Sequence, residues 1–231
     1  MKNKTSACDI NIKKSSCCSS EKTPEAKDLK SHWNKAYANN PEERLGWFET
    51  DLGPMFRLIN QISLTKSAHI INIGAGSTRL IDELIHQDYS NLIATDISEV
   101  ALKKLENRIG ESNVKIIVDD LTNPSKLNKL DKVDLWIDRA VLHFFTVEKD
   151  QDTYFNLLKS KVKPEGFVIL AEFNLQGATK CSGLEVFRYN SKMLQDKLGS
   201  DFKLLKAFDY NYTMPSGDNR TYVYTLFKRK Q

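Results

Sequence analysis

The sequence predicts an α/β fold built around a mostly parallel sheet. Five short apolar segments alternate along the chain with stretches whose apolar residues recur at helical spacing. Two longer β-rich segments, roughly 202–210 and 220–227, close the chain and are joined by a turn-forming segment that contains Pro215 and Gly217. We therefore expect helices on both faces of the sheet and an antiparallel hairpin at its C-terminal end.

The elements can be assigned in order from their periodicity. Apolar, β-branched runs predict strands at 69–73, 92–94, 114–118, 133–137 and 167–173. The intervening helices have one apolar face each; Ser98 and Thr146 are expected to cap two of them, and Gly199 to end the last. Residues 163–166 are expected to form a turn before the fifth strand.

Composition points to one soluble domain with a tail. The chain has 231 residues, of which 40% are hydrophobic and 28% charged. The formal net charge of +4 arises from basic residues interleaved with acidic ones, so no nucleic-acid partner is expected. No apolar run approaches the ~20 residues of a membrane span, so no membrane partner is expected either. Four cysteines fit a reducing compartment, which predicts a cytoplasmic location.

Residues 1–27 are predicted to be a disordered basic tail, because they are rich in Lys, Ser and Thr and have little to bury. This tail holds Cys8, Cys17 and Cys18, which we expect to be unstructured thiols. Capture of a soft metal or metalloid is the alternative, although adjacent cysteines do not have the spacing of a zinc site and no metal site is predicted. Residues 28–231 form the expected domain, with 28–65 as an N-terminal helical cap.

The cap is rich in aromatic residues. Trp33 and Tyr37 fall on one helical face, and Trp47 and Phe48 follow a turn. These side chains could pack the cap onto the core or form a lid over a ligand, and an aromatic face suits a cation.

Residues 69–96 form a strand–turn–helix–strand unit. Gly74 and Gly76 follow the first strand and allow a tight turn and the close approach of a ligand. Backbone N–H groups at the helix start favour polar or anionic groups. Asp96 ends the second strand, where a carboxylate can accept hydrogen bonds from both hydroxyls of a ribose. This spacing predicts a site for a nucleoside cofactor.

The turn distinguishes between cofactors. Arg79 stands where a dinucleotide fingerprint has its third glycine, and no GKS or GKT follows as in a phosphate-binding loop. The stretch instead resembles motif I of the class I S-adenosylmethionine-dependent methyltransferases, with Asp96 in the motif II position. Asn72 and Thr78 depart from the family, which usually has an acidic residue and often has a glycine at these positions. The resemblance covers residue 30 to the C-terminus and implies a Rossmann-like, doubly wound, seven-stranded sheet.

The resemblance also implies which residues bind S-adenosyl-L-methionine. In many relatives a W-x-x-x-Y segment closes over the methionine end of the cofactor, and an acidic residue in the motif III position lies near the adenine amino group. Asp120 fits that position better than Asp119. The implied cofactor set is Trp33, Tyr37, Asn72, Gly74, Ala75, Gly76, Ser77, Asp96, Ile97, Asp120, Leu121, Asp138 and Arg139.

The candidate catalytic residues lie in the motif IV position. Asp138 could orient an acceptor amine or the cofactor, and Arg139 could pair with the cofactor carboxylate or an acidic substrate. His143 could be a general base. Alternatively, Asp138 and Arg139 pair with each other and His143 is packed in a helix. The expected acceptor-binding residues are Trp47, His143, Cys181, Arg188 and Tyr189.

The implied activity is transfer of a methyl group to an unidentified nucleophile. Segments after residue 174 are similar to a group of bacterial class I methyltransferases. The W-x-x-x-Y opening, the Trp47-Phe48 pair and residues 137–144 are more loosely similar to the lysine-methylating methyltransferase-like proteins. Three acceptor hypotheses stay open: a protein lysine, a thiol or metalloid or other small molecule, and no acceptor at all in a non-catalytic scaffold.

Overall fold

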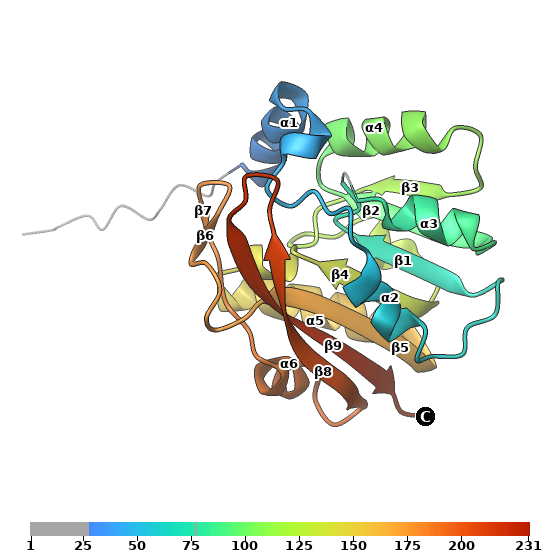
Figure 1. Cartoon of the computed structure of the whole chain (residues 1–231). Coiled ribbons are helices and arrows are strands. Elements are labelled where there is room, and N and C mark those ends of the chain that lie inside the picture. Colours follow the sequence, from blue (N-terminus) through green and yellow to red (C-terminus); the bar gives the residue numbers. More distant parts are fainter. Residues whose placement is uncertain (1–27, 77) are drawn as a thin grey trace, which may run out of the picture.

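Seven strands form one sheet in the order β3-β2-β1-β4-β5-β9-β8 (Figure 1). The first five in this order are parallel, and β9 is antiparallel to both β5 and β8. The doubly wound sheet with an antiparallel C-terminal hairpin is therefore confirmed. The computed structural model describes residues 28–76 and 78–231, so the expected tail with its three cysteines, and Ser77, lie outside the described residues. The strands are β1 His69–Ile73, β2 Asn91–Asp96, β3 Lys115–Val118, β4 Val133–Arg139, β5 Val162–Phe173, β8 Phe202–Thr213 and β9 Asn219–Arg229.

Apolar side chains from alternate positions of these strands bury both faces of the sheet. On one face, helices α2, α3 and α4 pack over residues such as Ile70 and Ala94. On the other face, α5 and α6 pack over residues such as Ile71 and Val168. The helices are α2 Gly53–Ile59, α3 Leu80–His86, α4 Glu99–Ile109, α5 Glu148–Lys161 and α6 Ser191–Leu198. None of the described helices is long and apolar enough to cross a membrane.

Helix α1 (Leu29–Asn39) lies against α4 near the carboxyl ends of the parallel strands (Figure 1). Two polar contacts fix it there. The Ser98 hydroxyl, which caps α4 as expected, donates a hydrogen bond of 2.8 Å to the Asn34 side chain. The Lys104 ammonium donates to the Tyr37 carbonyl over 2.6 Å. Helix α1 therefore lies over the edge of the sheet where the ligand is expected (Figure 1), and the 3-10 helix η1 (Glu42–Arg44) follows it in the chain.

Three local features differ from the sequence expectations. Helix α5 begins at Glu148 with Val147 as its N-cap, so Thr146 does not cap it; Glu148 and Asp150 supply negative charge to its first turn instead. Residues 163–166 belong to β5, where a positive φ of 64° at Glu165 and a register shift against β4 produce a bulge rather than a separate turn. A small hairpin of β6 (Lys180–Cys181) and β7 (Leu184–Glu185) also follows β5, where no periodicity predicted strands.

Candidate functional site

A pocket opens at the carboxyl ends of β1, β2, β3 and β4, beneath α1. It contains about 1120 Å³ of empty space, including the space at its mouth. Its lining joins the ends of four parallel strands to aromatic residues of the cap, so one pocket brings together the residues predicted for the cofactor and some of those predicted for the acceptor.

The glycine turn after β1 forms one wall of this pocket. Gly74 and Gly76 both have positive φ angles, 59° and 33°, as the tight turn requires. A Cβ atom on Gly74 would lie 2.1 Å from Val141 Cγ2, and one on Gly76 would lie 2.1 Å from the Tyr37 hydroxyl. In this structure the glycines therefore make room for the protein's own pocket-lining side chains, rather than for a ligand alone as the sequence suggested.

Asp96 is held at the pocket wall by two backbone groups. The N–H of Gly76 donates to Oδ2 over 3.1 Å, and the N–H of Ser98 donates to Oδ1 over 2.8 Å. Each carboxylate oxygen can accept a further hydrogen bond, so the donor set suits the two hydroxyls of a ribose. Burial raises the pKa of Asp96 to about 6. Asn72, Gly74 and Ile97 line the same wall.

The two acidic residues after β3 have different surroundings. The Asp119 carboxylate accepts backbone N–H bonds from Ser125 and Leu127 and so holds the next loop. Among the described residues, only Thr122 donates hydrogen bonds to the Asp120 side chain, and both its N–H and its hydroxyl reach Oδ1. Asp120 and Leu121 both line the pocket, so an adenine contact from Asp120 is geometrically open and stays a prediction.

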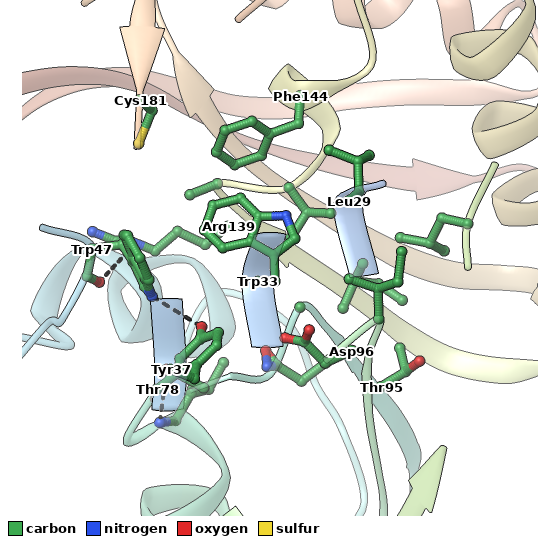
Figure 2. Close-up of a pocket in the computed structure, with 18 of the residues that line it drawn as sticks. Leu29, Trp33, Tyr37, Trp47, Thr78, Thr95, Asp96, Arg139, Phe144 and Cys181 are labelled. Atoms are coloured by element: carbon green, nitrogen blue, oxygen red, sulfur yellow. Dashed lines mark hydrogen bonds between the residues drawn. The ribbon is translucent and has the colours of Figure 1, made fainter. Parts of the chain in front are cut away.

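Aromatic side chains form the opposite wall. The Trp33 ring from α1 meets Trp47 and Phe144 edge to face, with centroids 5.2 Å and 4.9 Å away. Trp47 Nε1 donates a hydrogen bond of 2.9 Å to the Tyr37 hydroxyl. Figure 2 shows Trp33 at the centre of the pocket, with Asp96 and Thr95 toward one end and Trp47, Arg139 and Cys181 toward the other. The cap therefore serves as a wall of the pocket as well as packing on the core.

Arg139 pairs with Glu49 rather than with Asp138. Its Nε lies 3.1 Å from Glu49 Oε1, and its guanidinium lies 4.8 Å and 4.9 Å from the ring centroids of Tyr212 and Tyr222. Arg139 and Glu49 both line the pocket. Sequence reasoning missed Glu49, because it lies in an aperiodic segment; its only sequence signal is an acidic residue directly after the Trp47-Phe48 pair.

Asp138 and His143 lie behind the pocket wall, fully buried. The Tyr154 hydroxyl donates to Asp138 over 2.6 Å, and His143 Nδ1 lies 2.9 Å from Glu172 Oε2. Burial lowers the pKa of His143 to about 3, so its imidazole is neutral, and its ring stacks on Phe173. Neither side chain lines the pocket, which places both out of reach of an acceptor there.

The remaining predicted site residues divide between the pocket and its supports. Trp47 and Cys181 line the pocket. Arg188 donates to the Leu175 carbonyl over 2.7 Å, and Tyr189 is only 1% exposed, so these two residues support the loop after β5 instead of lining the pocket. Ala75 is also fully buried behind the turn.

Curated proteins with similar sequences are lysine methyltransferases by name. The EEF1A lysine methyltransferase 2 of Danio rerio is 26% identical over 208 residues, which are 83% of this chain and 85% of that protein. The protein of the same name from Mus musculus is 23% identical over 189 residues, which cover 75% of each chain.

Solved methyltransferase structures share the fold. A S-adenosylmethionine-dependent methyltransferase from Anabaena variabilis superimposes with a TM-score of 0.70 at 14% identity, over 87% of this chain and 93% of that one. A second structure, the 1,6-didemethyltoxoflavin-N1-methyltransferase of Burkholderia thailandensis with bound S-adenosylhomocysteine, has a TM-score of 0.65. It is 19% identical over 88% of each chain. A family model described as a methyltransferase domain matches residues 64–228, well over half of the sequence. With a matching fold and a pocket at the expected strand ends, the chain belongs to this methyltransferase domain family, and its methyl donor is S-adenosyl-L-methionine.

Proposed function

We propose that this enzyme methylates the ε-amino group of a lysine side chain in a protein. The aromatic wall built by Trp33, Trp47 and Phe144 is the observation that carries the proposal. A lysine side chain combines an apolar stem with a cationic tip, and aromatic faces stabilise both parts. The names of the curated relatives support the same acceptor class.

The chain's own residues position the reactants. Asp96 accepts hydrogen bonds from the ribose, and Asp120 and Leu121 line the end of the pocket assigned to the adenine. Trp33 and Phe144 exclude water from the centre of the pocket. When bound, the cofactor would supply a methyl group activated on a sulfonium; transfer to the neutral amine would form the N–C bond, leave the S–C electron pair on sulfur and release the amine proton to water. Positioning in a water-poor site then provides much of the rate enhancement.

Methylation of a thiol or metalloid is the weaker candidate. Cys181 lines the pocket, but burial raises its pKa to about 11. The group is therefore a thiol at neutral pH, whereas capture of a soft ion or nucleophilic attack needs the thiolate.

We also propose a cytoplasmic location, because the cysteine content fits a reducing compartment.

The acceptor class can be tested without knowing the acceptor. The full chain is incubated with soluble protein from cells that lack its gene and with S-adenosylmethionine labelled in the methyl group, and the labelled products are separated by size and hydrolysed to amino acids. We expect the label in protein, as methylated lysine, and none with the Asp96→Ala variant. Label confined to small molecules, or to another amino acid, would contradict the proposal.

Cofactor affinity is expected to depend on pH through Asp96. The ionised carboxylate accepts from both ribose hydroxyls, whereas the protonated group cannot, so affinity falls as the pH falls through the pKa of about 6. The dissociation constant of S-adenosylhomocysteine should be about tenfold higher at pH 5 than at pH 8. Calorimetric titrations across this range test this, and Asp96→Asn should give weaker binding with a flat pH profile. A tenfold change that persists in Asp96→Asn would assign the effect to another group.

A further inference from the structure

Glu49 is the acidic group at the end of the pocket away from the ribose site. The pocket-lining residues include four acidic ones, and Asp96, Asp119 and Asp120 all follow β2 or β3. Glu49 instead comes from the cap and pairs with Arg139, which lies toward the same end of the pocket as Trp47 and Cys181 (Figure 2). It is only 3% exposed, so its charge lies where water screens it weakly.

The contacts of Glu49 leave one carboxylate oxygen available. Arg139 Nε lies 3.1 Å from Oε1, and the Tyr224 hydroxyl donates to the same oxygen over 3.3 Å. Within residues 28–76 and 78–231, no hydrogen bond or ion pair reaches Oε2. A buried carboxylate with one free oxygen beside aromatic rings is suited to accept a charge-assisted hydrogen bond from an incoming cation.

Arg139 favours the charged form of this carboxylate and holds it in place. Burial raises the pKa of Glu49, and the Arg139 guanidinium opposes that shift. Arg139 is itself fixed, because its Nη1 donates to the Trp47 carbonyl over 3.2 Å and its guanidinium lies close to the Tyr212 and Tyr222 rings. The pair is electrically neutral before the acceptor arrives, so a single ammonium can enter without meeting a net positive charge.

We infer that Glu49 binds the acceptor's ammonium group through Oε2 and thereby selects cationic amines over neutral or anionic acceptors. This assignment rests on the proposed lysine methylation. The ammonium enters with the proton that it must lose before attack, and Glu49 aligns the nitrogen while water takes that proton. Glu49 is thus an acceptor-binding residue, while Arg139 is a positioning residue.

The test combines binding with kinetics. Binding of n-butylammonium, a mimic of the lysine tip, to the S-adenosylhomocysteine complex is followed by NMR, with 1-butanol as the neutral probe. We expect Glu49→Gln to weaken n-butylammonium binding by more than about tenfold, to leave 1-butanol and S-adenosylhomocysteine within about threefold, and to lower kcat/KM for the lysine acceptor mainly through KM.

A matched variant separates acceptor binding from the loss of a part-buried ion pair. Glu42→Gln removes the carboxylate that pairs with Arg108 over 3.3 Å, and Glu42 does not line the pocket. We expect this variant to bind n-butylammonium as the wild type does. Equal n-butylammonium affinity in Glu49→Gln and wild type would overturn the assignment, even if lysine methylation is confirmed. Tight n-butylammonium binding that depends on Glu49, without any transfer to lysine, would keep the cation site and overturn the proposed function.

Discussion

Glu172→Ala is expected to destabilise the fold by about 3 kcal/mol and to lower the melting temperature by roughly 6–12 °C. Glu172 lies on β5, fully buried, and its Oε2 accepts the backbone N–H of His143 over 3.2 Å and lies 2.9 Å from His143 Nδ1. Alanine would leave the buried backbone N–H of His143 without this acceptor and remove the carboxyl beside its ring. The measurement is thermal unfolding followed by circular dichroism.

Two control variants separate this network from general effects. Burial raises the pKa values of Asp138 and Glu172, and repulsion from Glu172 raises that of Asp138 further, so the charged form of each group is disfavoured. Glu172→Gln is neutral and of similar volume, and should cost less than about 1 kcal/mol. Glu185→Ala removes an exposed ion pair with Lys180 and should leave the melting temperature almost unchanged. If Glu172→Ala melts within two degrees or so of Glu185→Ala, the buried network does not stabilise the pocket wall as described.

Gly76→Ala is expected to weaken cofactor binding more than about tenfold while the chain still folds. The φ of 33° disfavours alanine, and its Cβ would lie 2.1 Å from the Tyr37 hydroxyl. The ring must then move and give up its hydrogen bond from Trp47. Because Tyr37, Trp47 and Asp96 all line the pocket, the displacement reaches the cofactor site. Calorimetry with S-adenosylhomocysteine measures the loss.

Two further variants separate the effects of Gly76→Ala: one reproduces the backbone strain alone, and the other removes the clash with the Tyr37 hydroxyl. Gly110 also has a positive φ, of 60°, but a Cβ there meets no atom within 4 Å and Gly110 lies outside the pocket. Gly110→Ala should therefore lower stability by about 1 kcal/mol without changing cofactor affinity. Tyr37→Phe removes the clashing hydroxyl, so Gly76→Ala should cost less affinity in that background. Equal losses in both backgrounds would argue against contact between the cap and the turn.

The parallel part of the sheet could be predicted because each strand is a continuous apolar run. Segments such as 69–73 and 133–137 are buried from both sides, and only helices between them permit parallel pairing. The residues predicted for the nucleoside end line one pocket for the same reason, since Asp96 ends β2, Asp120 lies just after β3, and the ends of parallel strands meet at one edge. The order of the strands came from family resemblance.

The proposed acceptor end could be predicted only in part: Trp47 and Cys181 were expected there, but Glu49 was not, because this end is assembled from segments distant in sequence. Glu49 and Arg139 are separated along the chain and meet only through the packing of the cap on β4, β8 and β9. His143 looked like a base because its type and position fit that role, and only burial against Phe173 and Glu172 places it behind the wall. The local sequence does not determine which side chains of the loop after β4 face the pocket, because tertiary packing sets their orientation.

Titration calorimetry of the full chain with S-adenosylmethionine, on wild type and on Asp96→Ala, tests the central claim most directly. We expect wild-type binding in the micromolar range and its loss in the folded variant, since Asp96 is the pocket-lining carboxylate that we propose to hold the ribose hydroxyls. Absence of binding to the folded wild type would contradict the assignment of the cofactor, and equal binding to both proteins would contradict the assignment of the site.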